Sequence, residues 1–314
     1  MFGLRLLGSV SDKLSQEPTN ALACAPSRCL RMRYSDSTCR RCATVCASQA
    51  IDLSDGLQLD RGACSGCLAC TAVCPSGALE AQEPFNRLLN RLATHIQDSF
   101  VLGCSRNQGP AHHRLPCLGM LAIEHLLTLA SHAACRLQLD CSGCGDCPAQ
   151  AMLPLLAETL QLAVALQPPA HPIELISQPE QRDYRSEQLD RRGFFSSFRA
   201  LANQGAQAVL AEEKPQPQQL AYGDKLLPSR RRLFLEQRER FSPAALSACT
   251  HALAFNDRCS GCMACVQACP SGALLKTAQT GDNLTPPQFT PDHCTGCGLC
   301  VEFCLDQAIT LDPA

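Results

Sequence analysis

The sequence predicts an α+β fold in which two small cysteine-rich modules flank a small parallel α/β domain. Half of the 24 cysteines fall into three complete runs of the form C-x2-C-x2-C-x3-C, and three more form an incomplete one. Residues 74–79 and 269–274 both read Cys-Pro-Ser-Gly-Ala-Leu, which indicates a duplicated module. Between the modules, short apolar runs alternate with helical patterns, as in parallel α/β domains. The expected domains are residues 1–80, 81–178, a basic helical linker over 179–243, and 244–314.

The C-terminal module contains two complete cysteine runs in tandem. A four-iron cluster needs four soft thiolates, and in such tandem runs each supplies three of them to one cluster and its fourth cysteine to the other. Zinc sites usually pair two C-x2-C units and do not need eight cysteines in this register. One predicted ligand set is Cys259, Cys262, Cys265 and Cys304, and the other is Cys269, Cys294, Cys297 and Cys300.

The N-terminal module has one complete run and one incomplete run, in which Asp36 stands at the first ligand position. The same crossing rule predicts one set from Cys46, Cys64, Cys67 and Cys70, and a second from Cys39, Cys42 and Cys74. We expect Cys29 to complete the second set, because thiolate is the softer donor and the intervening loop can fold back. Cys24, Asp36 and an open three-iron site remain alternatives. A short hairpin is expected over residues 50–53 and 57–60.

These tandem runs resemble bacterial-type ferredoxin domains that hold two [4Fe–4S] clusters. Pro270 ends its run as the family pattern expects, whereas Leu305 replaces the second proline without removing a ligand. The resemblance implies ferredoxin-like dicluster domains at both ends of the chain, and therefore four [4Fe–4S] clusters. Residues 274–276 and 309–311 are the expected strands of the C-terminal domain.

The middle domain is predicted from alternating helical and strand patterns, which favour a parallel sheet. Helices are expected over residues 86–97, 119–131 and 151–165, and strands over 100–103, 114–116, 136–139 and 173–176.

Five cysteines of this domain follow its predicted strands. The C-terminal ends of parallel strands share one edge, so these cysteines should lie together there. We expect a fifth [4Fe–4S] cluster on Cys141, Cys144, Cys147 and either Cys117 or Cys104, with a zinc site as the alternative. Cys135 precedes its strand and is expected at the opposite end. His112 and His113 are expected in a solvated loop.

The middle domain resembles the small iron–sulfur subunit of methyl-viologen-reducing hydrogenases. The resemblance rests on Gly103-Cys104-Ser105, Leu115-Pro116-Cys117-Leu118-Gly119 and Cys141-x2-Cys144. It implies electron exchange with a larger flavin or hydrogenase-type partner.

The linker contains no cysteine and carries 12 of the 27 Lys and Arg residues. Two arginine-rich segments look like twin-arginine export motifs, but such signals act at an N-terminus and these lie in mid-chain. Basic amphipathic helices are expected instead over residues 191–203 and 229–241. They would either pack on the flanking modules with their charges solvated or form a docking surface for an acidic partner.

Composition excludes several classes of function. The net charge of −2 does not favour nucleic-acid binding, and no stretch of about 20 apolar residues predicts a membrane span. Residues 1–10 lack the features of a signal peptide and are expected to form a surface helix. Clustered thiols require a reducing compartment, so we expect a cytoplasmic protein.

No motif predicts a catalytic residue or a substrate pocket, so no enzymatic activity is assigned to the chain alone. We expect a polyferredoxin that carries electrons one at a time through its clusters to or from a dehydrogenase, reductase or hydrogenase-type partner. The chain also resembles ferredoxin-type accessory proteins of molybdenum-containing oxidoreductases, through its repeated cysteine runs and arginine pairs. A maturation factor is therefore the alternative. A redox or iron sensor is a third possibility, although no DNA-binding element is predicted.

Overall fold

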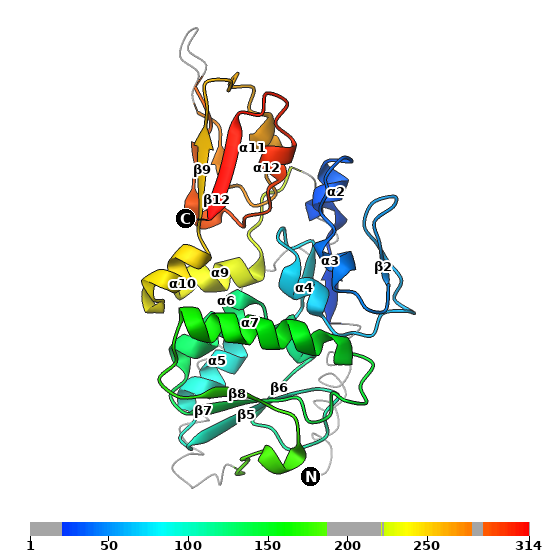
Figure 1. Cartoon of the computed structure of the whole chain (residues 1–314), viewed down its shortest axis with the longest axis vertical. Helices are drawn as coiled ribbons and strands as arrows, with labels where there is room; N and C mark the ends of the chain where they lie inside the picture. The colour runs from blue at the N-terminus through cyan, green and yellow to red at the C-terminus, as the bar shows by residue number, and fades with distance from the viewer. Residues whose placement is uncertain (1–20, 187–220, 222, 278–284, 314) are drawn as a thin grey trace, which may run out of the picture.

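The computed structural model describes residues 21–186, 221, 223–277 and 285–313 (Figure 1). The helices expected over residues 1–10 and 191–203 lie outside the described residues. None of the described helices is both long and apolar enough to cross a membrane.

The predicted parallel sheet is confirmed. Its order is β6-β5-β7-β8, and every neighbouring pair is parallel. The strands are β5 (Ser99–Cys104), β6 (His113–Leu115), β7 (Arg136–Asp140) and β8 (Ile173–Ile176). All six residues of β5 are buried, because this strand lies inside the sheet and reads as a continuous apolar run.

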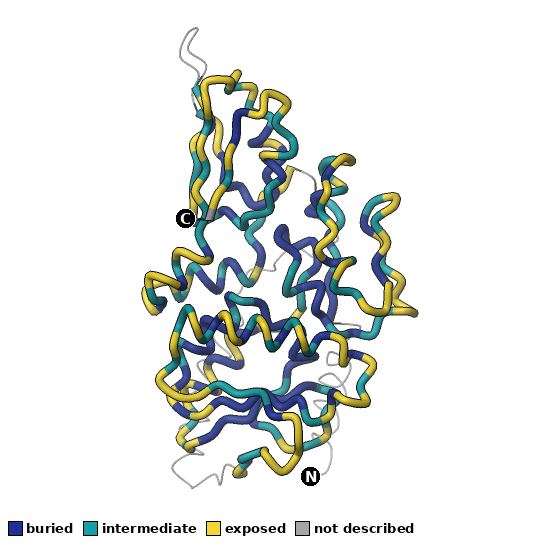
Figure 2. Tube along the Cα trace, in the orientation of Figure 1, coloured by how far each residue is buried: buried dark blue, intermediate teal, exposed yellow. Residues whose placement is uncertain are grey.

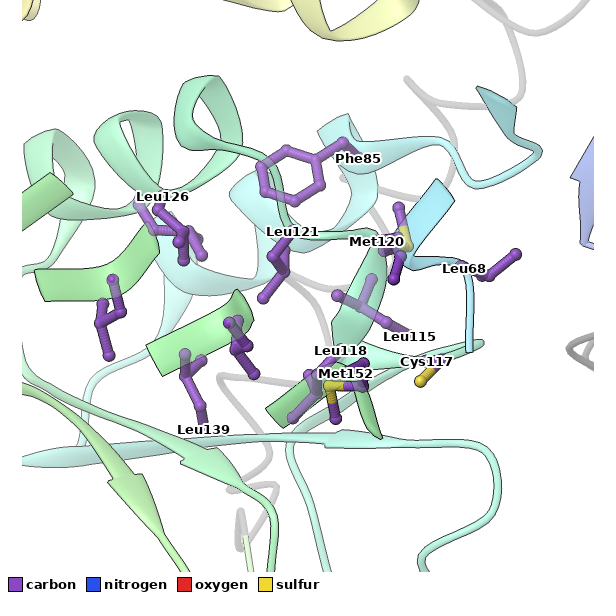
Figure 3. Close-up of a cluster of buried hydrophobic side chains, with 14 of the residues drawn as sticks. Leu68, Phe85, Leu115, Cys117, Leu118, Met120, Leu121, Leu126, Leu139 and Met152 are labelled. Atoms are coloured by element: carbon purple, nitrogen blue, oxygen red, sulfur yellow. The ribbon is translucent and has the colours of Figure 1, made fainter. Parts of the chain in front are cut away.

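Three helices pack on this sheet: α5 (Phe85–Thr94), α6 (Ile123–His132) and α7 (Leu153–Leu166). Their apolar faces meet it in a cluster that includes Phe85, Leu126 and Leu139 (Figure 3). Leu68, from the N-terminal module, belongs to the same cluster. The α/β domain and the N-terminal module therefore share one apolar core, and the expected boundary near residue 80 runs through it.

The N-terminal module is built from short elements around its cysteines. The predicted hairpin is confirmed as β2 (Ile51–Asp52) paired with β3 (Gln58–Leu59). A further antiparallel pair, β1 (Leu22–Cys24) with β4 (Leu79–Ala81), closes the module and was not predicted. The helices are α2 (Leu30–Arg33), α3 (Arg41–Thr44) and α4 (Ala69–Val73), with a 3-10 turn at Pro26–Arg28.

The C-terminal module has its own apolar core. The strands predicted at residues 274–276 and 309–311 are present, but each pairs with a strand that was not predicted. β10 (Leu274–Leu275) pairs with β11 (Gln288–Phe289), and β12 (Ile309–Pro313) pairs with β9 (His251–Phe255). The helices are α11 (Ala264–Ala268) and α12 (Leu299–Glu302).

The described end of the linker forms α9 (Ser229–Glu236) and α10 (Pro243–Ala248), which lie between the α/β domain and the C-terminal module (Figure 1). The helix predicted over 229–241 is shorter than expected, and its charges are not all solvated. Arg231 is only 3% exposed and Phe234 is 2% exposed. Main-chain carbonyl groups of the two modules accept hydrogen bonds from Arg230 and from the buried Arg231.

The expectation of a solvated loop at His112 and His113 is wrong. His112 is buried, and its Nδ1 accepts a hydrogen bond from the backbone N–H of Val101 at 2.8 Å. Its ring packs against Phe100 and Tyr184. His113 lies in β6, where burial lowers its pKa to about 4. His113 is therefore neutral at neutral pH, and neither imidazole stands in a solvated loop.

The α/β domain lies between the two modules in chain order, but the modules touch each other in space. The rings of Tyr34 and Phe303 meet edge-to-face at 5.1 Å. Glu302 accepts hydrogen bonds from the backbone N–H and the hydroxyl of Thr38. In Figure 2 most of the buried chain lies in the α/β domain and in the part of the N-terminal module beside it.

Candidate metal centres

The complete cysteine runs share a loop that wraps backbone around the thiols. The residue before the second cysteine is a glycine with positive φ in each: Gly66, Gly261 and Gly296. The residue after that cysteine is also left-handed, at Leu68, Met263 and Gly298, and it starts the short helix that carries the third cysteine. Left-handed Leu and Met each cost about 1 kcal/mol or more, which is the kind of strain found at binding sites.

The residue three positions beyond each fourth cysteine is also left-handed. These residues are Gln49, Gly77, Gly272 and Gln307. Their turns bring the chain back under the thiol, as in the hydrogen bond from the N–H of Gln307 to the carbonyl of Cys304 at 3.1 Å. The fourfold repetition shows that all runs end in the same local geometry.

Within the described residues, four cavities are each lined by four cysteines. We call them sites 1 to 4. The cavity volume is about 20 Å³ at each of sites 1 to 3 and about 250 Å³ at site 4. The cysteines are Cys46, Cys64, Cys67 and Cys70 at site 1; Cys29, Cys39, Cys42 and Cys74 at site 2; Cys269, Cys294, Cys297 and Cys300 at site 3; and Cys259, Cys262, Cys265 and Cys304 at site 4.

Site 2 is the place where sequence reasoning left the fourth thiol open. Cys29 lies on the cavity wall, and the backbone N–H groups of Arg31 and Met32 are directed at its sulfur. Asp36 is exposed, and neither it nor Cys24 lines the cavity. The incomplete run also lacks the left-handed turn, since Arg40 has a φ of −140° where Leu68 has +58°. Cys29 therefore takes the place that a first cysteine has in a complete run.

Burial raises the pKa of several thiols of these sites. Burial, and then the neighbouring Cys74 and Cys29, raises the pKa of Cys42 to about 12. Burial raises the pKa of Cys265 to about 11, with Cys262 adding to it. Four thiolates packed together repel one another unless positive charge lies between them. Iron supplies that charge and is bound by the deprotonated sulfur, so the donor set fits an iron–sulfur cluster.

Serine hydroxyls lie beside the fourth cysteine at sites 1 to 3. The Sγ–Oγ distances are 3.6 Å for Cys46 and Ser48, 3.8 Å for Cys74 and Ser76, and 3.6 Å for Cys269 and Ser271. Asp306 stands at the corresponding position of site 4 and accepts a hydrogen bond from Ser260 instead. Hydrogen bonds to sulfur are among the features that set a cluster's reduction potential.

The sheet edge collects the five cysteines of the α/β domain that follow its strands. Cys104 ends β5, Cys117 follows β6, and Cys141, Cys144 and Cys147 follow β7. The thiols are close enough to raise one another's pKa: burial and then Cys104 act on Cys117, and Cys144 acts on both. Cys135 lies at the opposite end of β7, near Asp98, as its position before the strand predicts.

This edge lies directly against site 1. A Cβ atom added to Gly119 would stand 2.2 Å from the carbonyl oxygen of Cys67, so only glycine allows this approach. The thiols of Cys117 and Cys67 also act on each other electrostatically.

Sequence reasoning missed the cationic side chains that hold the cysteine-bearing segments. Arg230 donates to the carbonyls of Ala72 and Cys74 at 2.6 and 2.7 Å. Lys225 donates to those of Gln267 and Cys269 at 2.6 and 2.7 Å. The repeat of Cys-Pro-Ser-Gly could have suggested equivalent environments for Cys74 and Cys269, but nothing in the linker sequence indicates which cations reach them.

In the part of the chain that the structure describes, no three His, Cys, Asp or Glu side chains are close enough together to hold a single metal ion. A four-iron cluster is wider than one ion, and its thiolates bind at its corners.

Comparison with known protein families agrees with this geometry. Residues 252–305 match the family described as 4Fe-4S dicluster domain, and residues 57–80 match the family described as 4Fe-4S binding domain. Neither a curated protein nor a solved structure matches the chain. The chain thus contains two ferredoxin-type 4Fe-4S domains, and its cofactors are [4Fe–4S] clusters.

Proposed function

We propose that this protein is a polyferredoxin that carries electrons one at a time between redox enzymes. The observation that carries the proposal is the set of four cavities, each lined by four cysteines. When bound to four thiolates, a [4Fe–4S] cluster accepts and releases single electrons. In this proposal the cysteines of sites 1 to 4 are the ligands, including Cys29 as the fourth thiolate of site 2.

The residues around each site hold the thiolates and adjust their environment. Backbone N–H groups and the serine hydroxyls donate toward sulfur, which stabilises negative charge on the reduced form. The left-handed turns fix the three thiols of each complete run before binding, so little ordering remains to be done there. Burial keeps water away from sites 1 to 3, whereas Cys262 at site 4 is exposed.

We further propose a fifth [4Fe–4S] cluster at the sheet edge, held by Cys141, Cys144, Cys147 and Cys117. The clustering of these thiols supports it, with Cys104 as the other candidate for the fourth ligand. A single zinc ion, the alternative expected from sequence, is less well supported, because no three described metal-binding side chains lie close enough together to hold one ion. The resemblance of this domain to a hydrogenase subunit supports a flavin- or hydrogenase-type enzyme as the partner. Because such thiols and clusters survive in a reducing compartment, we place the protein in the cytoplasm.

The accessory-factor alternative loses part of its support. The resemblance to accessory proteins used arginine pairs, and in the run Arg230–Arg232 two of the arginines bind carbonyls within this chain. These side chains are therefore occupied inside the protein rather than offered to an apo-enzyme.

The test is electron exchange under anaerobic conditions. Chemically reduced protein is mixed with candidate dehydrogenases, reductases and hydrogenases in a stopped-flow instrument, and reoxidation is followed by absorbance. The proposal predicts rapid reoxidation by at least one oxidised enzyme and none by the same enzyme inactivated at its own redox centre. Slow exchange with every candidate, together with tight binding to one apo-enzyme, would instead establish the accessory role.

A further inference from the structure

The contact between the two modules is formed by elements that belong to sites 2 and 3. Leu30 of α2, Ala268 of α11 and Leu299 of α12 make a small buried cluster, in which Leu30 is 2% exposed and Leu299 fully buried. Cys39 of site 2 and Cys297 of site 3 both pack against it. Leu30 also lines the cavity of site 2. One layer of aliphatic side chains thus separates a cysteine of one module from a cysteine of the other.

Polar contacts fix this arrangement around its rim. Arg33 donates to the carbonyls of Gln267 and Ala268 at 3.4 and 3.5 Å, at the C-terminal end of α11 where a cation is favoured. Glu302 of α12 accepts from Thr38 of the N-terminal module. The same carboxylate is close enough to Arg31 for the guanidinium to help lower its pKa, against the effect of burial.

Two cationic side chains of the linker also bind the main chain at sites 2 and 3. Lys225 holds the carbonyl of Cys269 and Arg230 holds that of Cys74, and both also bind the carbonyl two residues earlier. Cys74 is the distant thiol of site 2, and Cys269 is the distant thiol of site 3. A stretch of linker only a few residues long therefore binds the main chain at the distant cysteine of site 2 and at the distant cysteine of site 3.

We propose that this interface is an electron-transfer junction, in which the chain places sites 2 and 3 side by side so that a single electron passes between the modules. This inference rests on the proposed function. The exchange moves one electron: the cluster at one site is oxidised by one electron and the cluster at the other is reduced by one, with no bond made and no proton moved. Sites 1 and 4 are then the outer sites of their modules.

Thiols of sites 1 and 4 lie near thiols of sites 2 and 3, so the sites can be placed in a linear order. Cys70 of site 1 lies near Cys42 and Cys74 of site 2. Cys300 of site 3 lies near Cys265 of site 4. With Cys117 beside Cys67, the structure gives the sequence sheet edge, site 1, site 2, site 3, site 4.

The experiment compares two double variants of the full chain by EPR after reduction with dithionite. Cys64→Ser with Cys259→Ser removes sites 1 and 4 and leaves the inner pair. Cys42→Ser with Cys297→Ser removes sites 2 and 3 and leaves the outer pair. The inference predicts a split, spin-coupled spectrum for the first variant. In the second variant the only coupling expected is between site 1 and the sheet edge, and adding Cys144→Ser to both variants removes that contribution, so that the second then gives uncoupled signals. Uncoupled signals from the first variant, with its remaining iron retained, would overturn the junction and leave the proposed function standing.

A second comparison keeps every cysteine, in case a double variant does not fold. Glu302→Lys places a cation beside Arg31 at the rim, and Glu239→Lys makes the same change at an exposed position of the linker. We expect Glu302→Lys to weaken the coupling between the modules at unchanged iron content, and Glu239→Lys to preserve it. Undiminished coupling in Glu302→Lys would contradict the interface described here. Absence of iron from the unmodified protein would instead refute the proposed function.

Discussion

Replacement of Arg231 by methionine should weaken the attachment of α9 to the C-terminal module. The guanidinium donates to the carbonyls of Asp292 at 2.9 Å and Cys249 at 2.6 Å, and it lies 5.0 Å from the ring centroid of Phe234. Asp292 lies just before Cys294 of site 3, so the arginine ties the linker to a cysteine-bearing segment. Methionine has a similar length but offers no hydrogen bond.

The loss of stability in Arg231→Met can be estimated from these contacts. A hydrogen bond from a charged group contributes about 1.5–3 kcal/mol, and the two short bonds together give about 3–6 kcal/mol. Part of this is offset, because burial disfavours the charged guanidinium, as its lowered pKa shows. We expect a net loss of about 3 kcal/mol, which is roughly a hundredfold change in an equilibrium constant.

The assay is the rate at which cluster absorbance is lost in guanidinium chloride under anaerobic conditions, since unfolding that releases clusters is not reversible. The rate should rise by up to roughly a hundredfold if the contacts are broken in the transition state. Arg232→Met is the control, because this neighbouring arginine is half-buried and its side chain makes no hydrogen bond with the described residues. Equal rates for Arg231→Met and the unmodified protein, or equal acceleration by both variants, would refute the reasoning.

Three further predictions concern single positions. Gly119→Ala should cost about 2–3 kcal/mol, because its Cβ would meet the carbonyl of Cys67 at 2.2 Å, and a lower thermal midpoint by circular dichroism would show it. Cys29→Ser should remove the site 2 EPR signal whereas Cys24→Ser should not; the reverse result would make Cys24 the ligand. Burial lowers the pKa of His125 to about 4 from an ordinary 6.5, so its neutral form contributes stability above pH 6.5 that is lost as pH falls toward 4. The stability difference between the unmodified protein and His125→Gln, measured in urea, should therefore shrink between pH 7 and pH 4.5, and a constant difference would contradict this.

The cysteine spacing carries most of the information about the sites. Because each run is a tight local loop, its three thiols and the crossing fourth follow from sequence alone, and the structure lines its four cavities with those sets. The parallel sheet was also predictable, since strand and helix periodicities alternate over whole elements.

Other features depend on contacts that sequence does not encode locally. The strands Leu22–Cys24 and His251–Phe255 are short and pair with segments far away in the chain. Arg231 reads as a solvated charge, because its acceptors are main-chain carbonyls that have no sequence pattern. The packing of Leu30 against Leu299 joins residues from opposite ends of the chain, so the meeting of the two modules could not be foreseen.

The account's central claim, that each four-cysteine cavity holds a four-iron cluster, is tested most directly by iron and acid-labile sulfide per chain on anaerobically purified protein, with EPR of the reduced form. Sites 1 to 4 predict about 16 irons and about as many sulfides, and the sheet edge raises this to about 20, with spin-coupled signals. About 8 irons per chain would contradict the account, because it would mean that one of the two ferredoxin-type domains does not carry the clusters that its cysteines are proposed to hold.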